Sequence, residues 1–96
     1  MKISDIQAEA HRTAKAKGFY DDPPHFGTAI ALMHSELSEA LEAHRKNHTA
    51  GIAEEFADLV IRVADTCEYM GIDLESAVAL KMAFNRARPW KHGKEY

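Results

Sequence analysis

The chain has 96 residues, of which 46% are hydrophobic and 28% charged, and its formal net charge is −3. This length and composition are typical of one globular domain rather than a disordered chain, so we expect residues 1–96 to form a single domain. No apolar run approaches the roughly 18 residues that span a bilayer, and a polar, periodic segment rather than a signal peptide follows Met1. We therefore expect a cytoplasmic protein without a membrane partner. The single cysteine, Cys67, excludes an internal disulfide and a cysteine-rich zinc site.

The charge is distributed unevenly along the chain. Residues 35–75 carry ten acidic and three basic residues, whereas residues 76–96 carry five basic residues and one acidic residue. If the two blocks meet in space, an acidic metal site and cationic side chains flank one cleft, an arrangement that suits polyphosphate chemistry. The alternative is that the basic tail only screens the acidic helices. A short basic tail beside a larger acidic block makes a poor footprint for nucleic acid, so no nucleic-acid partner is expected.

The first predicted helix begins near Ser4, a candidate N-cap, and stops near Gly18. Residues 18–25 then form a loop, because Pro23 and the proline that follows it do not fit inside a helix. This loop carries Phe19 and Tyr20, which either stack on a flat ligand or cover the hydrophobic core.

The second helix is predicted over residues 26–46. Its core-facing positions recur at helical spacing and comprise Phe26, Ile30, Met33, Leu37, Ala40 and His44. Glu36 and Glu39 lie beside this apolar stripe rather than opposite it. A short connection with Thr49 as a candidate cap follows, so the second and third helices should be antiparallel neighbours.

The third helix is predicted over residues 51–70. Its expected buried positions are Ile52, Phe56, Leu59 or Val60, Val63, Cys67 and Met70, and a polar stripe beside them comprises Glu55, Asp58, Arg62 and Asp65. Gly71 ends this helix and Asp73 caps a fourth, which Pro89 stops. On this fourth helix Lys81, Asn85 and Arg88 share a face. We expect an all-α fold, a four-helix bundle-like domain with a basic C-terminal tail.

Two carboxylate pairs, Glu36/Glu39 and Glu55/Asp58, have i, i+3 spacing, so the members of each pair project from one helix face. In an antiparallel hairpin all four carboxylates converge on one groove. At an effective dielectric near 20, two like charges about 4 Å apart repel by about 4 kcal/mol. Basic partners or solvent exposure offer one remedy and a divalent cation offers another. Arg62 alone cannot neutralise four acids.

The types of ligand in this groove favour a hard cation. Carboxylates without cysteine and without suitably placed histidine select Mg²⁺, with Mn²⁺ as a second choice. A di-iron bundle typically contains Glu-x-x-His motifs. No glutamate in this sequence has a histidine three residues later, so the di-iron alternative is disfavoured.

The segments E36LSE39, E55FAD58 and K81MAFNRAR88 together resemble the MazG-like family of all-α nucleoside triphosphate pyrophosphohydrolases over nearly the whole chain. The family motif is EExxE followed by ExxD, and Ser35 replaces its first glutamate here. The resemblance implies hydrolysis of a nucleoside triphosphate between the α and β phosphates. It also implies Mg²⁺ bound by Glu36, Glu39, Glu55 and Asp58, with Glu36 or Glu39 accepting the proton of the attacking water.

The resemblance further implies how the substrate is held. Lys81, Asn85 and Arg88 would contact phosphate oxygens or the sugar, and the base would rest near the aromatic residues of segment 19–26 or near Trp90 of a neighbouring subunit. Members of the family commonly complete the bundle with a second chain, so a homodimer or homotetramer is expected. The competing hypothesis, which Ser35 and the short chain suggest, is a non-catalytic helical module that binds nucleotides or joins an assembly.

Overall fold

A computed structural model describes residues 1–94 of the protein, without the side chain of His92, and over these residues the fold is all-α, as predicted. The helices are α1 (Ile3–Ala16), α2 (Phe26–Arg45), α3 (Thr49–Met70) and α4 (Leu74–Ala87), followed by a short 3₁₀ helix, η1 (Trp90–Gly93). The last two residues of the predicted basic tail, 95 and 96, lie outside the described residues. Among the described residues, none of the helices combines the length and apolar character needed to cross a lipid bilayer.

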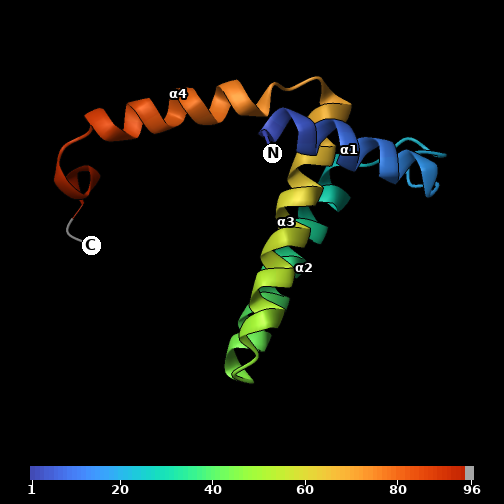
Figure 1. Ribbon diagram of the computed structural model, residues 1–96, viewed down its shortest axis with the longest axis horizontal. Helices are drawn as coiled ribbons and strands as arrows, with labels where there is room; N and C mark the ends of the chain where they lie inside the picture. Colours follow the sequence, from blue (N-terminus) through green and yellow to red (C-terminus); the bar gives the residue numbers. More distant parts are fainter. Residues whose placement is uncertain (95–96) are drawn as a thin grey trace.

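Helices α2 and α3 form a long antiparallel hairpin, as predicted from the short connection between them (Figure 1). Helix α1 lies across the end of the hairpin where α2 begins and α3 ends, and it packs against α3. Helix α4 starts at the same end but extends away from the hairpin (Figure 1), with its contacts to the rest of the chain made mainly to α1. Three helices therefore pack together within one chain, and the fourth is left as an arm.

The helix ends follow local signals in most places. Gly71 adopts the left-handed conformation, with φ of 72°, at the C-terminus of α3, and the side chain of Asp73 accepts a hydrogen bond from the backbone N–H of Ser76 at the start of α4. Two predicted caps are wrong by one or two residues. Helix α1 already begins at Ile3 with Lys2 as its N-cap, and His48 rather than Thr49 precedes α3.

The packing of the hairpin depends on small side chains and leaves large apolar ones exposed. Ala40 and Ala64 are the buried hydrophobic residues, at 5% and 1% exposure, and no large side chain within residues 1–94 is fully buried. Several side chains predicted to face the core are about half exposed instead, namely Phe26, Leu37, Phe56 and Met70. Of the alternatives Leu59 and Val60, Leu59 is the less exposed. Apolar side chains exposed in this number are unusual on the surface of a single folded chain.

A buried glutamine connects α1 to the turn between α3 and α4. Gln7 is 3% exposed, its Nε2 donates to the carbonyl oxygen of Ile72 over 2.8 Å, and its Oε1 accepts from the N–H of Leu74 over 3.2 Å. Ser4 also donates to the Glu75 carboxylate on α4. These contacts fix the point at which α4 leaves the body of the protein.

Candidate active site

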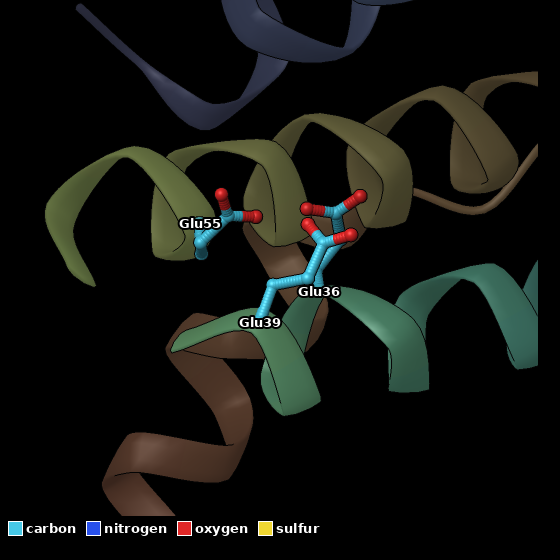
Figure 2. Close-up of side chains that lie close together, drawn as sticks. All are labelled: Glu36, Glu39 and Glu55. Atoms are coloured by element: carbon cyan, nitrogen blue, oxygen red, sulfur yellow. The ribbon is translucent and has the colours of Figure 1, made fainter. Parts of the chain in front are cut away.

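Three glutamates from α2 and α3 face one another across the hairpin (Figure 2). One carboxylate oxygen from each of Glu36, Glu39 and Glu55 lies within 4.8 Å of those of the other two. Glu36 is 6% exposed although it is an acidic residue, because its position on α2 points toward α3 rather than toward solvent. The structure thus brings together three of the four predicted metal ligands.

The fourth predicted ligand, Asp58, lies outside this group of three. It follows Glu55 by three residues on α3, is exposed, and lines the same cleft as Glu36. Arg62, one turn further along α3, donates from Nε to Oε1 of Glu36 over 3.2 Å. The sequence placed Arg62 within reach of Asp58 on the same helix, but the arginine pairs across the hairpin instead.

The three-glutamate cluster lacks enough positive charge and enough hydrogen-bond donors. Oε2 of Glu36 and Oε2 of Glu55 are buried and have no hydrogen-bond partner among the described residues. Hydrogen bonding to Glu39 and then to Glu36, together with burial and the negative charge of both, raises the pKa of Glu55 to about 8. Without a cation, the cluster therefore holds an extra proton near neutral pH.

These observations fit a hard divalent cation. Buried carboxylate oxygens without a partner are the kind of unsatisfied group that a bound ion explains, and several oxygen ligands from rigid helices suit Mg²⁺ or Mn²⁺. A cation would also take the place of the proton that Glu55 shares by hydrogen bonding with Glu39 and Glu36, and it would compensate their negative charge. Glu36, Glu39 and Glu55 are the residues placed to hold it.

A cleft of about 820 Å³ runs from the edge of this cluster along α1 and α3. Its acidic end contains Glu36 and Asp58 beside Arg62, and its other walls are largely apolar and aromatic. They include Tyr20, Phe26, Leu32, Ile61 and Tyr69. This volume and this combination of an apolar wall with a polar end are typical of a site for a small organic ligand.

The sequence did not single out a polar contact in the wall of this cleft. Oδ1 of Asp65 lies 2.9 Å from Nδ1 of His11 and accepts from the Tyr20 hydroxyl over 2.8 Å. The ring of Tyr20 stacks on that of Tyr69, with centroids 4.9 Å apart. The polar stripe on α3 included Asp65, but no feature of the sequence indicated that α1 and the following loop would supply its partners.

The predicted substrate-binding residues do not line this cleft in the same chain. Lys81 and Asn85 lie on α4, which points away from the hairpin (Figure 1), and Arg88 directly follows the last residue of this helix. Trp90 begins the 3₁₀ helix and is 82% exposed. Lys81 Nζ and Arg88 Cζ lie 4.7 Å and 5.8 Å from the centroid of the Phe84 ring. The cleft of the same chain therefore does not test their predicted role.

Comparison with known proteins identifies relatives of the chain. The family model described as phosphoribosyl-ATP pyrophosphohydrolase matches residues 5–80. A dATP/dGTP diphosphohydrolase of Salmonella phage PMBT28 is 40% identical over 65 residues, which are 68% of this chain and 21% of that protein. A dATP/dGTP diphosphohydrolase of Cyanophage S-2L is 33% identical over 64 residues, 67% of this chain and 57% of that protein.

The aligned region thus spans about a fifth of one relative and somewhat more than half of the other. No solved structure matches the chain. The family match covers all four carboxylates of the two motifs but ends at residue 80, before Lys81, Asn85, Arg88 and Trp90. The resemblance to all-α pyrophosphohydrolases that the carboxylate motifs predicted is confirmed, and the chain belongs to the phosphoribosyl-ATP pyrophosphohydrolase family.

Proposed function

We propose that the protein hydrolyses a purine deoxynucleoside triphosphate between the α and β phosphates, in a reaction that depends on Mg²⁺ and releases pyrophosphate. The observation that carries the proposal is the group of three glutamates with two buried, unpartnered oxygens at the end of an apolar cleft. The family match supports pyrophosphohydrolase chemistry, and the names of the two phage relatives support dATP and dGTP as substrates. Phosphoribosyl-ATP, after which the family is named, is the main rival substrate.

In this proposal Glu36, Glu39 and Glu55 hold the cation, and Asp58 contributes from the adjacent turn of α3. Mg²⁺ bound there would neutralise the carboxylates, contact phosphate oxygens and lower the pKa of a bound water. Either Glu36 or Glu39 accepts the proton of the attacking water. The Arg62 guanidinium lies at the acidic end of the cleft, where the donors that it does not use on Glu36 would bind a phosphate oxygen.

The apolar part of the cleft holds the base in this proposal. Its aromatic side chains supply flat surfaces for stacking, and Tyr20, Phe26 and Tyr69 line it. Of the two base positions predicted from the sequence, the cleft favours the aromatic residues of segment 19–26 within the same chain.

We further propose that the active unit is a homodimer or homotetramer in which α4 of one chain reaches the cleft of another. Lys81, Asn85, Arg88 and Trp90 would then contact the phosphates or the sugar of a substrate bound by the neighbouring chain. Two features support this arrangement. Helix α4 extends away from its own hairpin (Figure 1), and apolar side chains on α2, α3 and α4 are exposed.

Pyrophosphate release tests the reaction directly. With dATP or dGTP and Mg²⁺, Glu39→Gln and Asp58→Asn should lower kcat/KM about 100-fold or more, because each removes a charged ligand of the cation. Glu54→Gln changes an exposed carboxylate next to Glu55 and serves as the matched control. Unchanged activity in Glu39→Gln, with helicity and oligomer size intact, would disprove the assignment.

The non-catalytic module is separated by the same assay combined with calorimetry. Such a module binds a non-hydrolysable nucleotide but releases no pyrophosphate from dATP, dGTP or phosphoribosyl-ATP.

A mixing experiment tests whether two chains share one active site. Combining equal amounts of inactive Glu39→Gln and inactive Lys81→Ala should restore about a quarter of wild-type activity. Random subunit exchange makes half of all dimers mixed, and each mixed dimer has one intact site out of two. No recovery after subunit exchange would show that α4 serves its own chain.

A further inference from the structure

The wall of the cleft contains a carboxylate that is only partly satisfied. Asp65 is 21% exposed in its side chain, and Oδ1 receives both of its hydrogen bonds, from His11 and from Tyr20. Its other oxygen, Oδ2, has no hydrogen-bond partner within residues 1–94. Asp65 itself lines the cleft, so an acceptor is available to a ligand there.

The two neighbours of Asp65 keep it an acceptor. Burial first, and then the hydrogen bond to Asp65, raise the pKa of the Tyr20 hydroxyl, so that Tyr20 retains its proton and donates it. An ionised carboxylate can only accept, so Nδ1 of His11 is the donor in the second contact. The ring of His11 is further held edge-on against Tyr20, with centroids 4.6 Å apart. These contacts fix the orientation of Asp65, and a ligand group that faces Oδ2 must be a hydrogen-bond donor.

The position of Asp65 along α3 matches the length of a nucleotide. Asp65 follows Asp58 by seven residues, or about 10 Å along a helix. Both side chains line the same cleft, with Ile61 and Arg62 between them. A substrate with its phosphates at the acidic end would therefore place its base near Asp65 and Tyr69.

From this placement we propose that Asp65 is a specificity-determining residue that accepts a hydrogen bond from the exocyclic amino group of a purine base. This inference rests on the function proposed above and names the part of the substrate that the cleft recognises. A base without an amino group at that position leaves Oδ2 desolvated and without a donor. A base with a carbonyl oxygen there places two acceptors against each other. Both cost binding in the transition state, since buried polar groups left unpaired lower affinity sharply.

The competing interpretation is that Asp65 only anchors α1 and the loop after it to α3. That role predicts that mutation of Asp65 lowers the stability of the protein, and that kcat/KM does not depend on the amino group of the base. Comparing substrates that differ by this one group separates the two, and it requires no mutation.

The experiment measures kcat/KM for pyrophosphate release by the wild-type oligomer with two matched pairs. The first is dATP against the triphosphate of unsubstituted purine deoxyribonucleoside, and the second is dGTP against dITP. For the parent nucleotide that the enzyme prefers, loss of the amino group should lower kcat/KM at least about tenfold. In Asp65→Asn the ratio of kcat/KM between the parent nucleotide and its analogue should fall to within about threefold. The amide N–H₂ would then face the amino group of the base, and two donors form no hydrogen bond.

Gln7→Ala is the control for stability, because Gln7 holds α1 to the turn after α3 but neither contacts Asp65 nor lines the cleft. It should lower the melting temperature as Asp65→Asn does while keeping the wild-type preference for the amino base. Equal kcat/KM for parent and analogue in the wild type would overturn the role of Asp65 while leaving the proposed reaction intact. No pyrophosphate from either parent would overturn the proposed reaction and this inference with it.

Discussion

The proton held by the glutamate cluster predicts a measurable exchange of protons for metal. Because the pKa of Glu55 is raised above its ordinary value to about 8, the metal-free protein is most stable with the cluster protonated. That contribution is present at low pH and is lost as the pH rises through about 8. Its melting temperature without metal should therefore fall between pH 6 and pH 9, and Mg²⁺ should raise it increasingly over the same range.

The pKa also fixes how many protons leave when the ion binds. A group with a pKa of about 8 is about 90% protonated at pH 7, so each Mg²⁺ should release about 0.9 proton at pH 7, about 0.5 at pH 8 and about 0.1 at pH 9. The pKa belongs to the coupled cluster, so the proton is counted for Glu36, Glu39 and Glu55 together.

Isothermal titration calorimetry with Mg²⁺, in two buffers of different ionisation enthalpy that do not bind the metal, gives this number. Glu54→Gln should leave it unchanged, because Glu54 is exposed and outside the cluster. Glu55→Gln should abolish the release and weaken binding, and it should flatten the pH dependence of the metal-free melting temperature. Binding with less than about 0.2 proton released at both pH 7 and pH 8 would refute the reasoning.

Three further substitutions test the packing around the site by thermal denaturation. Arg62→Met should destabilise the metal-free protein by about 1–2 kcal/mol, since Glu36 loses its hydrogen-bond donor. Saturating Mg²⁺ should reduce this difference in stability between the variant and the wild type. An equal difference with and without the metal would contradict the reasoning. Gly51→Ala should lower the free energy of unfolding by about 1–3 kcal/mol, because a Cβ there lies 2.7 Å from Nδ1 of His48 and 3.3 Å from Cβ of Ala43. Gly27→Ala is the control, since a Cβ there has no neighbour within 4 Å, and it should be neutral or slightly stabilising. Equal effects at the two glycines would show that the hairpin is less closely packed. Gln7→Ala should cost about 1–3 kcal/mol by leaving two backbone groups unpaired, and an unchanged melting temperature would mean that water replaces the amide.

Much of the secondary structure could be predicted because its causes are local. Gly71 adopts the left-handed conformation at the end of α3 because it has no Cβ, and Asp73 caps the next helix with its own side chain. The spacing of Glu36 and Glu39, and of Glu55 and Asp58, determined by itself that each pair shares a helix face. The short connection between the helices then made their meeting expected, and Glu36, Glu39 and Glu55 do meet.

The local sequence pattern did not determine which apolar residues are buried. Leu37 and Phe56 fit the period of a core-facing stripe, yet both remain about half exposed in the single chain, and Glu36 occupies the contact between the helices. Periodicity identifies a face but not what covers it, and the direction in which α4 leaves the turn depends on the contacts of Gln7 and Ser4. The predicted roles of Lys81, Asn85, Arg88 and Trp90 therefore stay predictions that a second chain must fulfil.

The sequence by itself determined an all-α chain with an acidic hairpin, and the motifs on that hairpin were enough to indicate the family. Only the tertiary structure decided that Arg62 pairs across the hairpin with Glu36, that Asp58 stands outside the group of three, and that His11 and Tyr20 both donate to Asp65. The physical reason is that helical register is fixed by neighbours three or four residues apart. A contact between residues 45 or 54 positions apart, as in the pairing of Asp65 with Tyr20 and His11, depends on how whole helices pack.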